Sequence, residues 1–308
     1  MYARWVLVSL ALAFAICAAP IAAQAQKTIV DQNGREVSLA DTSKIISIGG
    51  DITEILYAIG ADSRIVAVDS TSQFPPRALK EKKDVGYLRA LSTEGVLSIN
   101  GTIIIASDKA GPPEVVKALK GTTVPYVEIK ENYTPEGIAE KVRFVSRVAG
   151  LEPEGEKVAT QIERDFQALA DVRARIAKPL RALFVLNVAN GRAMVGGSDT
   201  AADAVIKLAG ATNAAAGVSG FKPLSDEALL ELQPEAIVTM RRTQSGTHDA
   251  DQLMAMKGMS ATPAAVSKRL ITMDGLYMLG FGPRAPAAAL DLMRELYPEI
   301  AAQTQPGK

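Results

Sequence analysis

The sequence has 308 residues, 48% of them hydrophobic, and its 34 basic residues balance its 34 acidic ones. A chain without net charge argues against nucleic acid as a partner, because nucleic-acid binding requires a concentrated basic surface. The only cysteine, Cys17, lies in the first 25 residues. The rest of the chain therefore offers no disulfide, no thiolate metal site and no cysteine nucleophile.

Residues 1–25 have the pattern of a secretory signal peptide. One early cation, Arg4, precedes an apolar run from Trp5 to Ala19, and Ala23-Gln24-Ala25 is a small-x-small cleavage pattern. The apolar run is too short for a stable membrane span. A lipid anchor on Cys17 would require a leucine three positions before it and small residues between them. Phe14-Ala15-Ile16 matches this pattern poorly. The sequence predicts a mature protein that begins near residue 26 outside the cytoplasm.

The first part of the mature chain alternates strands and helices. We predict a hairpin over 27–37 around Asn33-Gly34, read as a type I′ turn. After it come strands at 45–48, 65–68, 102–105 and 124–128 and helices at 52–59, 92–99 and 113–119. Such an alternation predicts parallel pairing with helices on the faces of the sheet.

A helix-then-strand unit occurs twice. Leu91 to Ala106 and Leu224 to Thr239 share Leu-Ser-x-Glu and keep the same periodicity. Two halves built on one plan are therefore expected. The second half adds a strand at 182–188, a Gly-rich loop at 189–198, a helix at 200–208, a strand at 270–273 and a closing helix at 286–297.

A long amphipathic helix over 153–176 separates the halves. At about 1.5 Å per residue it is roughly 36 Å long, which is enough to cross from one lobe to the other. The predicted fold class is α/β, with two lobes, each a mostly parallel central sheet flanked by helices, joined by this one helix. The expected boundaries are 26–150, 151–177 and 178–308. A helical connector resists bending, so we expect lobes that move little relative to each other.

Loops that follow the carboxyl ends of parallel strands line ligand crevices. Tyr87 and Arg89 follow a strand in the first half, and Arg241 and Arg242 follow one in the second. These four residues are candidates to face a common cleft.

The motifs resemble those of haem-binding periplasmic proteins of bacterial ABC importers, in the helix-linked class that also carries cobalamin and ferric siderophores. The segments are S-I-G-G-D-I-T-E-I at 47–55, D-V-G-Y-L-R at 84–89, L-S-T-E-G at 91–95, G-S-D-T-A-A-D at 197–203 and F-G-P-R at 281–284. Gly-Tyr-x-Arg before Leu-Ser-x-Glu is the most discriminating of them. The lobe architecture alone would not separate ligand classes.

The resemblance implies that Tyr87 is the axial ligand of haem iron. Ferric iron is a hard acid that suits a phenolate oxygen, and a nearby guanidinium such as Arg89 favours the charged phenolate. Arg242, or its neighbour Arg241, is implied as the partner of the haem propionates. Tyr277 is a candidate to flank the porphyrin face. The alternatives are that both tyrosines only pack and that the arginines are surface charges.

Some relatives of this kind carry a second axial ligand, a histidine in the loop after the first strand of the second lobe. Residues 186–191 contain no histidine here, so we expect five-coordinate iron with tyrosine alone. The sole histidine, His248, lies in the polar segment 245–251 and is interpreted as an exposed loop residue. A distal-ligand role is the alternative.

Glu94 and Glu227 hold equivalent positions in the two copies of the repeat. The resemblance implies that each docks onto arginines of the membrane permease, which works with an ATPase. The alternative is a carboxylate that only stabilises the first turn of its helix. The protein is expected to act as a monomer.

Three functions compete. The first is haem capture and delivery to the importer, and the second is the same architecture with a ferric siderophore or cobalamin as cargo. Divalent-metal capture would require several histidines. A periplasmic enzyme is the third. The mature sequence has neither a cysteine nor a G-x-S-x-G elbow to supply a nucleophile. We therefore expect a carrier and not an enzyme.

Overall fold

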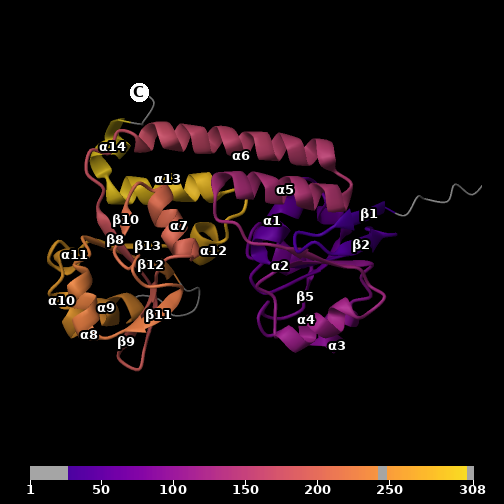
Figure 1. The fold of residues 1–308 in the computed structure, drawn as a ribbon, viewed down its shortest axis with the longest axis horizontal. Coiled ribbons are helices and arrows are strands. Elements are labelled where there is room, and N and C mark those ends of the chain that lie inside the picture. Colours follow the sequence, from indigo (N-terminus) through magenta and orange to yellow (C-terminus); the bar gives the residue numbers. More distant parts are fainter. Residues whose placement is uncertain (1–26, 242–247, 304–308) are drawn as a thin grey trace, which may run out of the picture.

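The computed structural model describes residues 27–241 and 248–303 and divides them into two α/β lobes, bridged by a long helix (Figure 1). The predicted signal peptide and Arg242 lie outside the described residues. The fold class predicted from the sequence is confirmed. No helix within the described ranges has the length and apolar character needed to cross a membrane.

The first lobe has a five-stranded parallel sheet in the order β5-β4-β3-β6-β7. Its strands are Ile45–Ile48 (β3), Ile65–Val68 (β4), Lys83–Asp84 (β5), Ile103–Ser107 (β6) and Tyr126–Ile129 (β7). Its helices are Gly50–Ala58 (α1), Ala78–Glu81 (α2), Thr93–Leu97 (α3), Pro113–Lys120 (α4) and Pro135–Ala149 (α5). Every residue of β3 and β6 is buried, as expected of central strands covered on both faces.

The predicted amino-terminal hairpin is present as strands Lys27–Val30 (β1) and Glu36–Leu39 (β2). The type I′ turn is wrong, because five residues connect the strands and Asn33 does not have a positive φ. Asp31 organises this longer loop instead. Its carboxylate accepts hydrogen bonds from the backbone N–H groups of Asn33 and Arg35, at 3.0 and 2.9 Å.

The second lobe has a mixed sheet in the order β11-β9-β8-β12-β13, with β10 beside β8. Its strands are Arg181–Ala189 (β8), Arg192–Gly196 (β9), Thr212–Asn213 (β10), Phe221–Leu224 (β11), Ala236–Arg241 (β12) and Leu270–Asp274 (β13). The segment 189–198, predicted as a loop, contains β9. Asn190 and Gly191 both have positive φ, near 53° and 70°, and this tight turn folds β9 back along β8.

The helices of the second lobe surround this sheet and close the chain (Figure 1). They are Ala201–Leu208 (α7), Asp226–Leu232 (α8), His248–Ala255 (α9), Lys257–Ser260 (α10), Pro263–Val266 (α11), Gly275–Leu279 (α12), Ala285–Leu296 (α13) and Pro298–Gln303 (α14). His248 therefore begins a helix, which corrects the prediction that it lies in a loop. Its side chain is outside the described part of the structure.

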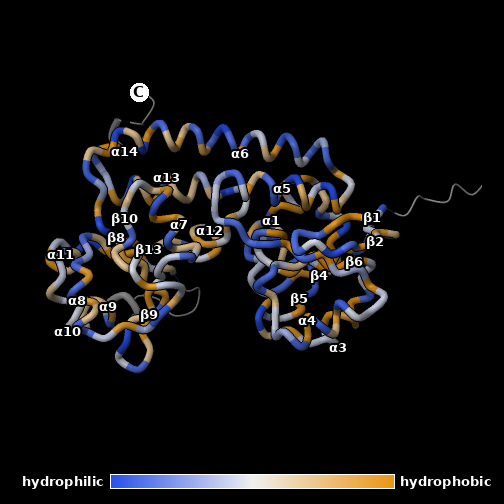
Figure 2. The backbone as a smooth tube through the Cα atoms, viewed as in Figure 1, coloured by the Kyte–Doolittle hydropathy of each residue, from blue (hydrophilic) through white to orange (hydrophobic). Residues whose placement is uncertain are grey.

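Helix α6, Glu152–Arg173, is the predicted connector and runs along α5 of the first lobe and α13 of the second (Figure 1). Ala159, Ile162, Phe166 and Leu169 are buried on one stripe. Most of the other residues of α6 are hydrophilic and exposed (Figure 2). Arg143 of α5 clamps this helix through Glu156 and Glu163, at 2.8 and 2.7 Å. The connector is thus fixed to the first lobe along its side as well as at its start.

The two lobes face each other through the carboxyl ends of their strands. Helix α1 begins just after β3, and α12 begins just after β13. A Cβ atom on Gly50 would lie 2.4 Å from the Thr71 carbonyl oxygen of its own lobe and 2.7 Å from Leu276 Cδ1 of α12. The Thr71 backbone therefore requires glycine here, and the short distance to Leu276 shows that α12 packs against the start of α1. Residues 281–284 between α12 and α13 then contact the first lobe, as described below.

Candidate functional site

The segment 85–91, which carries Tyr87, lies across the carboxyl edge of the first-lobe sheet. Its backbone hydrogen bonds run from Val85 N to Val68 O, from Ser70 N to Gly86 O, from Gly111 N to Leu88 O and from Leu91 N to Gly111 O, all at 2.8–3.0 Å. The segment is therefore tied to the loops that follow β4 and β6. Gly86, with φ near 92°, supplies the left-handed turn that starts it.

Tyr87 and Arg89 point away from the core of the lobe. Leu88 between them is buried, with 8% of its surface exposed, whereas Tyr87 is 45% exposed. Arg89 is also exposed. An exposed aromatic ring next to a cation, held on a rigid rim, leaves both side chains free to contact a ligand.

In the second lobe, Arg241 lies at the carboxyl edge of the sheet, as Tyr87 and Arg89 do in the first lobe. Arg241 is the last residue of β12, is exposed, and pairs in register with Asp274 at the end of β13. Helix α12, which contacts the first lobe, starts directly after Asp274. Arg241 therefore lies on the side of its sheet that faces the other lobe. Its neighbour Arg242 is outside the described residues.

The side chain of Tyr277 is occupied within its own lobe. Its hydroxyl donates to Asp291 Oδ2 at 2.8 Å, and the Arg284 guanidinium lies 5.0 Å from the centre of its ring. Burial, and then the hydrogen bond to Asp291, raise the pKa of this phenol above its usual range. The hydroxyl is therefore neutral and committed to Asp291, which leaves only a ring face for a ligand.

Glu94 and Glu227 occupy the same place in two similar helices. Each is the second residue of its helix and is exposed, and each helix has a serine N-cap, Ser92 on α3 and Ser225 on α8. A backbone N–H and the Ser225 hydroxyl lower the pKa of Glu227 below its usual range. Both helices lie on the side of the molecule opposite α6 (Figure 1). The structure thus places two exposed carboxylates on the same side of the molecule, one in each lobe.

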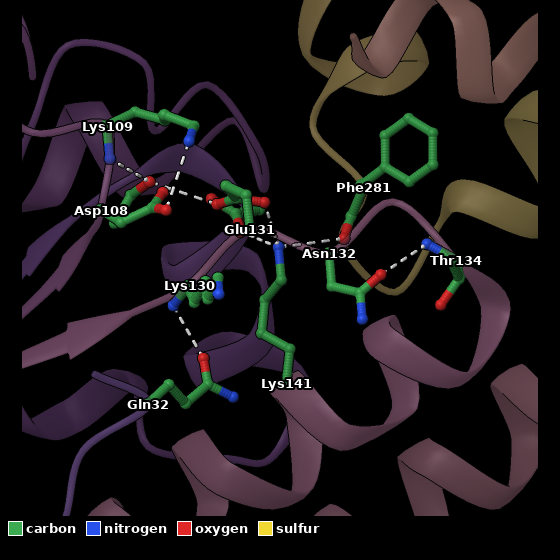
Figure 3. Close-up of polar contacts among 11 residues, drawn as sticks. Gln32, Asp108, Lys109, Lys130, Glu131, Asn132, Thr134, Lys141 and Phe281 are labelled. Atoms are coloured by element: carbon green, nitrogen blue, oxygen red, sulfur yellow. Dashed lines mark hydrogen bonds and ion pairs between the residues drawn. The ribbon is translucent and has the colours of Figure 1, made fainter. Parts of the chain in front are cut away.

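The lobe junction holds a buried ion group that sequence reasoning missed. The ammonium nitrogen of Lys141 lies 2.6 Å from Asp51 Oδ2 and 2.7 Å from Glu131 Oε2. It also donates to the carbonyl oxygen of Phe281 in the second lobe, at 3.4 Å (Figure 3). The side chain of Lys141 is 1% exposed and each of the two carboxylates is 8% exposed. A signal was present, because Lys141 falls on the apolar stripe between Ile138 and Val145.

The single positive charge of Lys141 cannot balance the negative charges of both Asp51 and Glu131. Burial and the neighbouring Asp51 carboxylate raise the pKa of Glu131 to about 7, against the opposing effect of Lys141. Burial by itself lowers the pKa of Lys141, but Asp51 and Glu131 together raise it above its usual range. The lysine is therefore charged, and Glu131 is the member of the group that titrates near neutral pH.

An ion pair between Glu54 and Arg284 joins the two lobes beside this group. Arg284 Nη2 lies 2.8 Å from Glu54 Oε2, and the backbone N–H of Arg284 donates to Glu54 Oε1 at 3.1 Å. The same guanidinium lies 3.6 Å from the ring centre of Phe74. Asp51 and Glu54 belong to the motif at 47–55, and Arg284 to the F-G-P-R motif. Both motifs therefore hold the lobes together.

Two cavities among the described residues lie away from Tyr87 and Arg89. One, of about 380 Å³, is lined by β13 and by Tyr277, Asp291, Arg294 and Glu295. The other, of about 280 Å³, lies at the start of the first-lobe strands beside Val96, Leu97 and Val124. Neither is lined by Tyr87, Arg89 or Arg241. Among the described residues, no group of three His, Cys, Asp or Glu side chains could hold a metal ion.

A family model for the periplasmic binding protein family matches residues 45–277, which is most of both lobes. The chain belongs to this family. Members of this periplasmic binding protein family are ligand carriers that work with the membrane permease and ATPase of ABC transporters.

Solved structures of similar proteins cover almost the whole fold. The chain is 36% identical to the periplasmic heme-binding protein RhuT from Roseiflexus sp. RS-1, with a TM-score of 0.79 over 84% of this chain and 100% of that one. It is 32% identical to a periplasmic heme-binding protein from Pseudomonas aeruginosa, with a TM-score of 0.77 over 83% and 93%. A vitamin B12-binding protein from Vibrio cholerae is 29% identical over 67% of this chain and 73% of its own.

Proposed function

We propose that this periplasmic binding protein captures haem between its two lobes and delivers it to an ABC importer in the inner membrane. The observation that carries the proposal is the exposed Tyr87 phenol on the rigid rim of the first lobe, in the Gly-Tyr-x-Arg motif. The greater identity and coverage of the heme-binding structures, compared with the vitamin B12-binding relative, support haem over cobalamin.

The proposed site uses residues from both lobes. Tyr87 ligates the ferric iron through its phenolate oxygen, and Arg89 stabilises that anion. Arg241 and Arg242 pair with the haem propionates, since guanidinium groups bind carboxylates in a bidentate manner. Tyr277 offers its ring to the porphyrin face. Because Tyr87 is the only ligand assigned, the iron is five-coordinate.

The remaining parts of the proposal concern the whole chain. Residues 1–25 are a signal peptide that is removed, 26–150 and 178–308 are the lobes, and 151–177 is the linking helix. The protein acts as a monomer and catalyses no reaction. A cleft formed by two exposed rims suits a ligand that must be bound and then released intact.

A spectroscopic titration tests the function. Ferric haem added to the purified apoprotein is expected to give a saturable Soret band and the charge-transfer bands of tyrosinate-ligated iron. The matched comparisons are cyanocobalamin and a ferric siderophore, each added at the same concentrations. Their binding is followed by isothermal titration calorimetry. Binding of either one, together with no saturable haem signal, would favour the alternative cargo.

The docking role of the two glutamates has its own test. Glu94→Ala/Glu227→Ala is expected to reduce haem-dependent growth or uptake in cells by roughly tenfold while haem binding by the purified protein is unchanged, because charges on a docking face act on encounter and orientation. Glu114→Ala/Glu231→Ala, two exposed glutamates nearby, is the matched control. Normal uptake by the first double variant would remove the docking role.

A further inference from the structure

The contact between the lobes depends on a short segment in an unfavourable backbone conformation. Phe281 has φ near 49°, in the left-handed region that bulky residues avoid, and its side chain is 1% exposed. Its ring packs edge-on against Tyr133 of the first lobe, with 5.0 Å between ring centres. Its carbonyl oxygen accepts from Lys141 (Figure 3). Contacts with the other lobe therefore hold this segment in place.

Lys141, which donates to this carbonyl oxygen, uses all three of its N–H donors. An ammonium group has three N–H donors, and those of Lys141 go to Asp51, Glu131 and the Phe281 carbonyl. The bond to Phe281, at 3.4 Å, is the longest of the three and so the weakest. Since the two carboxylates lie in the first lobe, they compete with the second lobe for the same cation.

We infer that the Asp51–Lys141–Glu131 group is a proton-linked latch between the lobes: when the Glu131 carboxylate takes up one proton from solvent, Lys141 binds the Phe281 carbonyl more tightly and the angle between the lobes becomes fixed. The ionised form of Glu131 loosens this contact. Neither the motif resemblance nor the proposed haem site requires the latch, and it acts in the protein without ligand.

The charges around Glu131 explain why its ionised form loosens the contact between the lobes. With Glu131 ionised, the buried group has one cation for two anions, and Asp108 adds a further negative charge nearby. Ser107 Oγ donates to Glu131 Oε1 at 3.2 Å. Tyr133, on the same loop, has a pKa raised to about 12 by burial and by Glu131, so it stays neutral and supplies no charge. Excess negative charge in a dry site favours entry of water and separation of the lobes.

The effect on stability has a definite sign. The folded-state pKa of Glu131 is raised from 4.5 to about 7. Stability that derives from its neutral form is fully present below pH 4.5 and is lost as the pH rises through about 7. The latch is therefore closed in mildly acidic solution and weakened above neutral pH.

Distance measurements between spin labels test the latch directly. The labels are placed at Lys117→Cys on α4 and Glu231→Cys on α8, two exposed positions in different lobes. The mature chain from residue 26 has no cysteine of its own, and the measurement is made without ligand. We expect one narrow distance distribution at pH 6 and a distribution broadened or shifted by several ångströms at pH 8. Identical distance distributions at the two pH values would overturn the proposal. The residues of the junction are unchanged in this experiment, so it does not depend on the folding of a junction variant.

A variant then assigns the effect to Glu131. Glu131→Gln keeps the shape and removes the titration, so its distance distribution is expected to be the narrow one at both pH values. Its melting temperature between pH 6 and 8 is expected to fall by roughly 4 °C less than that of the parent. Glu140→Gln, an exposed neighbour of Lys141, is the control and is expected to behave as the parent. A Glu131→Gln profile that matches the parent would contradict the assignment.

Discussion

Tyr87→Phe is expected to weaken the binding of ferric haem on the order of 100-fold, or about 2.7 kcal/mol, and to abolish the tyrosinate charge-transfer bands. The substitution removes one oxygen atom from a side chain that is 45% exposed on a rim, so the fold is not affected. Apolar contacts with the porphyrin and the arginine contacts with its propionates remain, which is why weak binding should persist. Calorimetric titration and the absorption spectrum are the measurements.

A matched variant separates ligation from general effects of losing a hydroxyl. Tyr57→Phe on α1 removes the same atom from a residue whose ring packs under Arg77, at 4.8 Å, and is expected to bind haem as the parent does. Arg89→Gln is expected to weaken binding by about tenfold, since it removes only the stabilising charge. Unchanged affinity and spectrum in Tyr87→Phe would remove the assigned ligand while leaving the proposed lobe junction untouched.

Lys141→Met is expected to lower the free energy of unfolding by about 3–5 kcal/mol at pH 8. The change leaves Asp51 and Glu131 in the junction without their cation, and both carboxylates are 8% exposed. The loss should be smaller at pH 5.5, because Glu131 then takes up a proton and only one charge is left unpaired. Urea unfolding at the two pH values, read by circular dichroism, measures both effects.

Two controls show whether the cause is the uncompensated charge. Lys157→Met on α6 removes an exposed lysine and is expected to change stability by less than about 0.5 kcal/mol. Asp51→Asn/Glu131→Gln/Lys141→Met removes all three charges and is expected to recover a large part of the loss. If the triple variant were as unstable as the single one, packing of the lysine stem would be the cause instead.

Besides the linking helix, which the sequence predicts to limit lobe motion, the structure contains a second restraint between the lobes. The sequence predicted a helical connector that resists bending, and α6 is fixed along α5 by Arg143. The junction at residues 281–284 adds one ion pair between the lobes, a hydrogen bond from Lys141 to the Phe281 carbonyl oxygen, and a ring contact. Restraint at two places limits hinge motion more than a helix alone. The latch makes one of these restraints depend on pH.

The sequence by itself determined the order of the main strands and helices, the two-lobed plan and the linking helix, because these follow from local periodicity and from a repeat in which Ser92 and Ser225 each cap a helix before a buried strand. It also singled out Tyr87, Arg89 and the two equivalent glutamates, since their motifs are contiguous. Even the missed strand β9 had a local signal, in Asn190-Gly191.

Only the tertiary structure decided what happens between the lobes. Asp51, Glu131, Lys141 and Phe281 are separated by up to 230 positions, and no local pattern relates a lysine on one helix to a carbonyl in the other lobe. The same holds for the hydroxyl of Tyr277, which is committed to Asp291. Periodicity reports which face of an element is buried. Whether a buried charge is compensated depends on side chains that meet only when the chain has folded.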